Sequence, residues 1–120
     1  MYGTSPEMLK RMYVVGSLKN QDEGFVLQVK NLIESGSVSG VSKLSVDGQE
    51  RSGEGITLQI GDKVRKASEV NWSSPLYVNY GATLTIYVPG KLEPGAHTVN
   101  LQFYVPELGS ISMPITDTIG

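Results

Sequence analysis

The stretch TLTIYVPGKLEPGAHTVNLQFYV, residues 83–105, decides the fold class of this chain. Apolar and polar residues alternate in 82–88 and again in 98–105, and a period of two is typical of strands with one buried face. The segment between them, residues 89–97, contains two Pro-Gly pairs that mark turns. Its length suits a crossing between two sheets better than a tight hairpin. The residues expected to face the core are Leu84, Ile86, Val88, Val99, Leu101, Phe103 and Val105.

The rest of the chain favours strands as well. It holds thirteen Val, seven Ile, seven Thr and fourteen Gly but only three Ala, a composition that disfavours helices. Asp47-Gly48 predicts a type I′ hairpin. Glu34–Gly40 is expected to be a flexible loop that acts as a lid or a connector, and Lys63–Trp72 a helical or turn-rich interlude. Further strands are expected at 12–18, 24–30, 41–46 and 56–60.

These patterns predict an all-β fold, an antiparallel β-sandwich that forms a single domain over residues 1–120. Residues 1–11 are expected to form a loosely ordered N-terminal arm. At 120 residues the chain is long enough to bury a core without disulfides or a structural metal.

Composition excludes several classes of function. The chain has no Cys, which removes disulfides, Cys-ligated zinc and thiol catalysis. A net charge of -2 argues against binding to nucleic acid. The densest basic cluster is formed by Lys63, Arg65 and Lys66 and is too small to bind several phosphates. The longest uncharged stretch is broken by polar residues and prolines, so no membrane span is expected. No secretory signal is recognised, and a cytoplasmic location is expected by default.

The sequence offers little material for catalysis. His97 is the only imidazole, and its place after a Leu-x-Pro-Gly motif is typical of a sandwich corner in which the ring packs and bonds nearby backbone. The carboxylates lie in or beside predicted turns, where a charged residue usually meets water. We therefore expect no catalytic residue, no metal ligand and no cofactor site on this chain.

Charge is distributed unevenly along the chain. Residues 1–69 carry eighteen of the twenty-two charged side chains, and the remaining four are Lys91, Glu93, Glu107 and Asp117. Charged side chains usually solvate the outer faces of a sandwich, so this depletion indicates a surface covered by another polypeptide. Ser- and Thr-rich faces are also ordinary in β-sandwiches, and both interpretations stay open.

Aromatic residues of the charge-poor half are candidate anchors for such a partner, because Trp and Tyr dominate interfaces energetically. The C-terminal stretch alternates apolar residues around Pro114, as an edge strand would. The predicted partner interface comprises Trp72, Tyr77, Tyr80, Met113, Pro114 and Ile115.

Two other classes of function compete with this interpretation. A carbohydrate-binding module would stack exposed aromatic rings on sugars and act as a monomer. A self-assembling structural sandwich would form homo-oligomers by pairing of edge strands.

Several segments together resemble a known family. They are VVGSLKNQDEGFVLQV (14–29), VDGQE (46–50), the lone Trp72, and TLTIYVPGKLEPGAHTVNLQF (83–103). In order and spacing they are similar to the β subunit of bacterial C-glycoside deglycosidases, in particular the gut-bacterial enzymes that act on flavonoid and isoflavone C-glucosides such as puerarin. The sequence departs from that pattern at Asn31–Gly36, where relatives carry an aromatic and basic cluster.

The resemblance implies a non-catalytic subunit of a lyase complex that cleaves the carbon–carbon glycosidic bond of 3-oxo C-glucosides. It implies binding to a TIM-barrel α subunit, similar to sugar-phosphate isomerases, within a larger hetero-oligomer. The catalytic His and a divalent metal, expected to be Mn²⁺, would belong to that partner.

Overall fold

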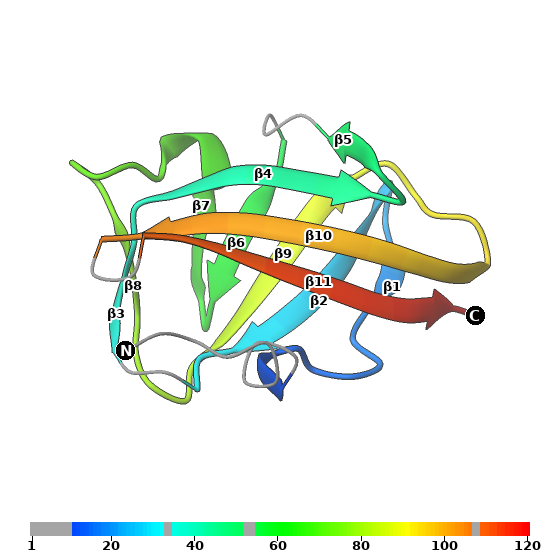
Figure 1. Cartoon of the computed structure of the whole chain (residues 1–120), viewed down its shortest axis with the longest axis horizontal. Helices are drawn as coiled ribbons and strands as arrows, with labels where there is room; N and C mark the ends of the chain where they lie inside the picture. Colours follow the sequence, from blue (N-terminus) through cyan, green and yellow to red (C-terminus); the bar gives the residue numbers. More distant parts are fainter. Residues whose placement is uncertain (1–10, 33–34, 52–54, 107–108) are drawn as a thin grey trace.

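The chain folds into two antiparallel sheets and a short ribbon in a computed structural model that describes residues 11–32, 35–51, 55–106 and 109–120 (Figure 1). The five-stranded sheet contains, in spatial order, β1 (Lys19–Gln21), β2 (Gly24–Lys30), β9 (Thr83–Pro89), β6 (Thr57–Ile60) and β7 (Lys63–Lys66). The four-stranded sheet contains β11 (Gly109–Ile119), β10 (Gly95–Val105), β4 (Gly40–Val46) and β5 (Gln49–Arg51). The ribbon pairs β3 (Gly36–Val38) with β8 (Leu76–Val78), and a 3-10 helix, η1 (Ala67–Glu69), follows β7. The predicted all-β antiparallel fold is confirmed.

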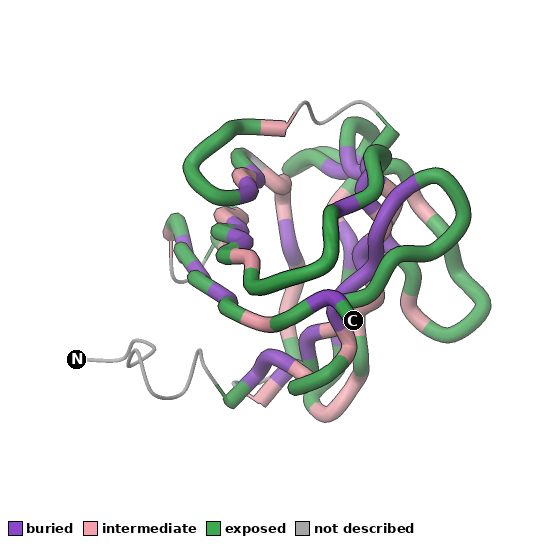
Figure 2. The backbone as a smooth tube through the Cα atoms, turned by 90° about the vertical axis from the view of Figure 1, so that its right-hand side faces the viewer, coloured by how far each residue is buried: buried purple, intermediate pink, exposed green. Residues whose placement is uncertain are grey.

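The two sheets pack face to face and bury the core between them. In Figure 1 the four-stranded sheet lies in front, and its long strands cross those of the sheet behind. Buried and exposed residues alternate most clearly along β10 and β11 (Figure 2), so the four-stranded sheet has one core face. The largest fully buried side chains include Phe25 and Leu27 from one sheet and Leu44, Leu101 and Met113 from the other.

The segment after β9 crosses from one sheet to the other, as its length predicted, because β9 and β10 belong to different sheets. Asn20 holds this crossing in place. Its side chain donates a hydrogen bond to the carbonyl of Leu92 and accepts one from the amide of the same residue, both at 2.8 Å. The Leu92 side chain is buried, so the crossing segment packs against the core.

The predicted hairpin at Asp47-Gly48 is confirmed. Asp47 has φ 52° and Gly48 φ 86°, and Val46 pairs with Gln49 across the turn. Positive φ at both central residues defines the type I′ turn, which favours Asp or Asn followed by Gly.

The strand predicted at 12–18 is wrong. Tyr13 makes only an isolated bridge to Val29, and the chain then turns at Gly16, which has φ 86°. The amide of Ser17 donates to the carbonyl of Val14 across this turn. The β-type composition of the segment reflects burial of Met12, Tyr13 and Leu18 in the core, not strand pairing. The N-terminal arm predicted at 1–11 lies outside the described residues except for its last position.

Two loop predictions need correction. Part of the expected loop at 34–40 forms strand β3, and residues 33–34 are outside the description. The expected interlude at 63–72 begins as strand β7, because a hairpin that turns at Gly61 pairs it with β6. The turn-rich part is limited to η1 and the residues after it.

Candidate functional site

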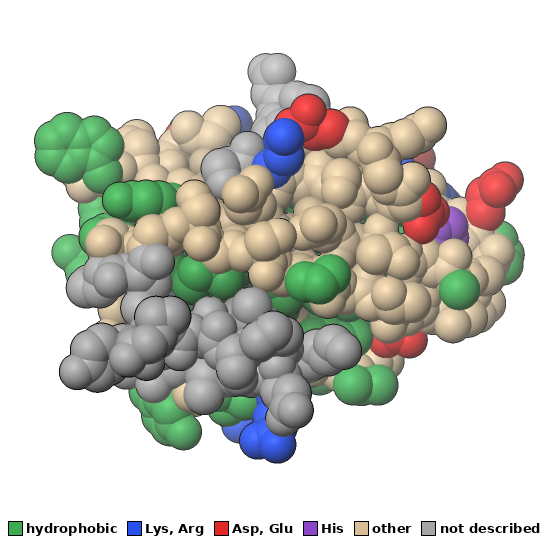
Figure 3. Space-filling model, in the orientation of Figure 1, with side chains coloured by type: hydrophobic (Ala, Val, Ile, Leu, Met, Phe, Trp, Pro, Cys, Tyr) green, Lys and Arg blue, Asp and Glu red, His purple; other side chains and the backbone are tan. Residues whose placement is uncertain are grey.

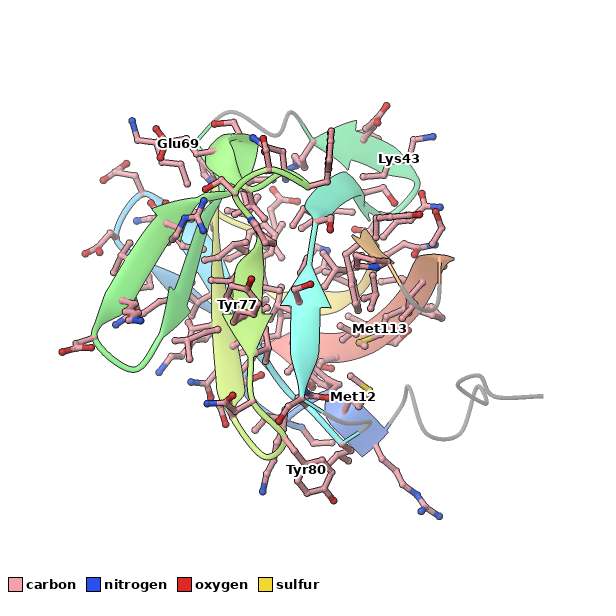
Figure 4. All side chains as sticks on the ribbon, turned by 90° about the vertical axis from the view of Figure 1, so that its left-hand side faces the viewer. Met12, Lys43, Glu69, Tyr77, Tyr80 and Met113 are labelled. Atoms are coloured by element: carbon pink, nitrogen blue, oxygen red, sulfur yellow. The ribbon has the colours of Figure 1, made fainter. Side chains whose placement is uncertain are left out.

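Three aromatic side chains of the predicted interface are exposed. Trp72, Tyr77 and Tyr80 have exposed fractions of 83%, 73% and 62%. Figure 4 shows Tyr77 on β8 and Tyr80 in the loop beyond it, at the end of the molecule that lies on the left in Figure 1. Trp72 lies in the turn that precedes β8. Exposed rings of this size are the surface features that most need a physical explanation.

Trp72 occupies the tip of a closely bonded turn. The amides of Asn71 and Ser74 each donate to the other residue's carbonyl, at 3.2 and 3.0 Å. The side-chain oxygen of Asn71 accepts hydrogen bonds from the Ser73 amide, the Ser73 hydroxyl and the Ser74 amide, between 2.8 and 3.0 Å. Such an Asx-type arrangement fixes the backbone on both sides of the exposed indole.

Arg65 fastens this turn to the sandwich. Its guanidinium donates to the carbonyls of Glu69, Ser74 and Pro75, each at 3.0 Å, and to the Ser74 hydroxyl at 2.9 Å. Arg is suited to this role because its planar group presents several donors in a fixed geometry. The turn that carries Trp72 is therefore fixed by its own hydrogen bonds and by those of Arg65 on β7.

Asn31 plays the corresponding role for the loop that carries Tyr80. Its side-chain amide donates to the carbonyls of Val78 and Asn79 at 3.1 and 3.4 Å, and the residue is 8% exposed. The amide of Tyr80 itself donates to the Ser35 hydroxyl at 2.8 Å. These bonds limit the freedom of the loop beneath the exposed ring.

The C-terminal part of the predicted interface needs correction. The Met113 and Ile115 side chains are 0% and 3% exposed and face the core, because the alternation of β11 places Pro114 outward instead. Pro114 lies on the outer face of the four-stranded sheet, and Tyr77 on the separate ribbon. The six predicted residues therefore do not form one surface. The β11 strand is indeed an edge strand.

His97 is a structural residue at a corner of the sandwich, as its motif predicted. One ring nitrogen, Nε2, lies 2.7 Å from the carbonyl oxygen of Glu93, and Nδ1 lies 2.6 Å from a carboxylate oxygen of Asp47. The Glu93 carbonyl and, next, the Asp47 carboxylate raise the pKa of His97 above its ordinary value of 6.5. The pKa of Asp47 is lowered by the Thr98 amide and the imidazole. Both ring nitrogens are thus engaged in joining three segments.

A second polar cluster ties the N-terminal segment to β11. The Tyr13 hydroxyl donates to the Asp117 carboxylate at 2.6 Å and accepts from the Leu18 amide at 3.0 Å, while the Gly16 amide donates to the same carboxylate oxygen at 2.8 Å. Burial, then the bond to Asp117, raises the pKa of Tyr13 above 10.0. Sequence reasoning missed this cluster because its members are about a hundred positions apart in the chain.

The polar clusters around Arg65, His97 and Tyr13 hold the fold together, so we take the exposed aromatic surface as the candidate site. Among residues 11–32, 35–51, 55–106 and 109–120, no three His, Cys, Asp or Glu side chains are grouped to hold a metal ion. No helix of the described part has the length and apolar character to cross a membrane.

Comparison with known families gives a match that covers most of the chain. The profile of the family described as "Hydroxymethylglutaryl-CoA reductase, N-terminal domain" matches residues 8–120. No curated protein matches the sequence.

The family match corrects the function inferred from resemblance. The identification as a C-glycoside deglycosidase β subunit is wrong, and so are the lyase activity, the TIM-barrel partner and the alternative of a carbohydrate-binding module. The expectation of Mn²⁺ in that partner loses its basis. Within the segments that carried the resemblance, Asn20 and His97 hold turns of the sandwich in this structure. Residues with such a structural role do not by themselves indicate an activity.

Proposed function

The chain belongs to the family of hydroxymethylglutaryl-CoA reductase N-terminal domains, and we propose from this premise that it is a non-catalytic domain that docks onto the catalytic part of such a reductase. The catalytic part would lie elsewhere in the same polypeptide or on a separate chain. The docking surface is the aromatic end formed by Trp72, Tyr77 and Tyr80.

The chemistry of reduction supports a non-catalytic role. Reducing an acyl-CoA thioester needs a hydride donor held against the carbonyl and a proton donor beside it. The only imidazole of the chain, His97, is occupied in the corner. Tyr13 and Asp117 are bonded to each other and to backbone amides. These groups stabilise the sandwich and are not free to serve a substrate.

The observation that carries the proposal is the rigid presentation of Trp72. The Trp72 side chain is 83% exposed and so contributes little to the stability of the free domain, yet its turn is fixed by Asn71 and Arg65. A pre-ordered aromatic anchor loses less conformational entropy on binding, which is a main determinant of affinity. Interfaces concentrate their binding energy in such Trp and Tyr anchors.

The proposal is tested by isothermal titration calorimetry of this domain against the catalytic part of the reductase from the same source. Trp72→Ala should weaken binding at least about tenfold, the usual cost of losing an anchor residue. Val15→Ala is the matched control, because Val15 is also 83% exposed but lies in the turn before Ser17. Absence of binding by the unmodified domain, or equal effects of the two substitutions, would overturn the docking role.

Arg65→Met tests the rigidity of the turn while the Trp72 ring stays present. This substitution keeps the aliphatic part of the side chain and Trp72 itself but removes the hydrogen bonds to the turn. Binding should weaken while the circular dichroism spectrum stays that of the folded protein. If Trp72→Ala weakens binding and Arg65→Met leaves it unchanged, the anchor does not depend on pre-ordering.

An activity assay tests the non-catalytic role independently. The domain alone should not oxidise NADH or NADPH in the presence of hydroxymethylglutaryl-CoA, and turnover by this chain alone would refute the proposal. The cytoplasmic location expected from the sequence also stays a proposal, to be tested by fractionating cells that express the full-length protein.

A further inference from the structure

The three exposed aromatic side chains follow one another along strand β8. Trp72 lies in the turn before the strand, Tyr77 at its middle and Tyr80 in the turn after it. Leu76 and Val78 are buried, so Tyr77 is the residue of β8 that points outward. Figure 4 shows Tyr77 on the exposed side of the strand and Tyr80 below it. We name Trp72, Tyr77 and Tyr80 the aromatic row.

The aromatic row lies in an uncharged part of the chain. Residues 70–90 contain no Asp, Glu, Lys or Arg, and the residue opposite Tyr77 on β3 is Ser37. In Figure 3 hydrophobic groups project at the upper left of the molecule, and no charged group is visible among them. The guanidinium of Arg65 is already engaged by the turn that carries Trp72. A charged segment would lose water here without gaining a counter-charge, so the row favours an uncharged segment.

Each ring of the row ends in a group that can donate a hydrogen bond. The indole of Trp72 is a donor only, and the hydroxyls of Tyr77 and Tyr80 can donate. Within the part of the chain that the structure describes, these three groups bond to no other residue. A polyproline II segment has the complementary chemistry, because its carbonyls have no internal hydrogen bonds and its prolines have no N–H. A helical segment satisfies most of its own carbonyls and would leave the donors unpaired.

The spacing of the row also fits a polyproline II segment. Tyr77 and Tyr80 are three residues apart, and an extended chain rises about 3.3 Å per residue, so their Cα atoms are at most about 10 Å apart. Polyproline II has three residues per turn and rises about 3.1 Å per residue, so one side of it repeats about every 9 Å. A β-strand repeats about every 7 Å on one side and fits this interval less well.

We propose that the aromatic row binds an uncharged, proline-rich segment in the polyproline II conformation. This inference rests on the docking role proposed above and names the chemistry of the partner segment that occupies the row. Proline-rich segments are bound elsewhere by surfaces lined with aromatic rings, because their conformation is already ordered before binding. The row is ordered as well: Asn71 and Arg65 fix the turn before β8, and Asn31 and Ser35 bond to the loop after it. Two ordered partners lose less conformational entropy on association.

Fluorescence of the full chain tests the proposal, because Trp72 is its one tryptophan and is 83% exposed. The probe is a peptide of four Ala-Pro-Pro repeats, which has no aromatic residue. The emission maximum should move to shorter wavelength and saturate as this peptide is added. A peptide of four Ala-Ser-Ser repeats has the same length and no charge, and it should cause no shift. No shift with the proline peptide up to about 5 mM, or equal shifts with both peptides, would overturn the proposal.

Variants of Tyr77 test whether the row itself is the binding surface. Tyr77→Ala should weaken binding of the proline peptide at least about tenfold, as expected for an anchor residue. Tyr77→Phe removes only the hydroxyl and should weaken binding about two- to tenfold. Val64→Ala is the matched control, because Val64 is 60% exposed but lies on β7, outside the row, and this change should leave binding unaltered. Circular dichroism checks that each variant is folded. Unchanged binding by Tyr77→Ala would overturn the proposal.

Competition separates this inference from the docking role. The catalytic part of the reductase is titrated into the domain by calorimetry, with and without the proline peptide, and the peptide should reduce its binding. If the catalytic part binds but the peptide neither binds nor competes, the proline-rich ligand is wrong and the docking role stands. If the peptide binds and the catalytic part does not, the docking role is wrong and the ligand class is supported.

Discussion

Replacing Tyr13 by Phe tests how the N-terminal segment is fastened to the sandwich. The change removes one hydroxyl, which donates to Asp117 at 2.6 Å and accepts from the Leu18 amide at 3.0 Å. The ring stays in place, since Tyr13 is 7% exposed and Phe fills the same volume. The loss of stability therefore reports the two hydrogen bonds and not a cavity.

The structure sets the expected magnitude. The bond to the carboxylate contributes about 1 kcal/mol, because Asp117 is partly exposed and keeps its bonds to the Gly16 and Thr118 amides. The buried Leu18 amide loses its acceptor, which costs about 1–2 kcal/mol. We expect the free energy of unfolding to fall by about 2–3 kcal/mol. For a chain of 120 residues this lowers the Tm by about 8–12 °C.

Urea unfolding followed by circular dichroism measures this loss, with Tyr77→Phe as the control. Tyr77 is 73% exposed, so its substitution should leave stability unchanged. The pKa of Asp117 is held below 3.8 by the Tyr13 hydroxyl first and then by two amides. Its contribution is present above that pH and is lost as the pH falls through the folded-state pKa, so the difference between the unmodified protein and Tyr13→Phe should shrink in acid to the part due to the Leu18 amide. Equal stability of Tyr13→Phe and Tyr77→Phe at neutral pH would show that the Tyr13 hydroxyl does not fasten the N-terminal segment.

Three further predictions concern the corner and the core. The pKa of His97 is raised above 6.5 by the Glu93 carbonyl and the Asp47 carboxylate that face it. Its contribution to the free energy of unfolding is therefore full below about pH 6.5 and is lost as the pH rises through the folded-state pKa. Thermal melts should show this loss of stability, and His97→Gln should remove the pH dependence. Gly24→Ala would drive its Cβ into the carbonyl oxygen of Val88 and should destabilise by about 1–3 kcal/mol in urea unfolding, whereas Gly40→Ala, with its nearest atom at 3.8 Å, should be tolerated. Leu101→Ala, at a site 2% exposed, should cost about 2–5 kcal/mol by the same measurement, and a loss below about 1 kcal/mol would place Leu101 outside the core.

Elements whose signals are local can be predicted from the sequence. The alternation in 98–105 placed Val99 and Leu101 in the core, and Asp47-Gly48 located a hairpin to the residue. A side-chain period of two and a requirement for positive φ depend only on neighbouring residues. The crossing between sheets followed from the length of one segment.

Predictions from local composition are wrong where long-range packing decides the conformation. Residues 12–18 have a strand-like composition, yet they lie as an irregular segment because Tyr13 is bonded to Asp117 at the far end of the chain. The predicted interface places Met113 and Pro114 together, although the alternation of β11 directs them to opposite faces. The alternation was visible in the sequence, but which face would meet the other sheet was not.

Tertiary structure alone decided the surfaces on which the proposals depend. The sequence showed that charges are scarce after residue 69, and the fold places the uncharged outward positions of β10 and β11 on one sheet face and Trp72 on a turn held by Arg65. It also joined His97 to Asp47, fifty positions away. Contacts of this kind arise from strand order and register, which depend on pairing energies summed over the whole sandwich and leave no signal in any short stretch of sequence.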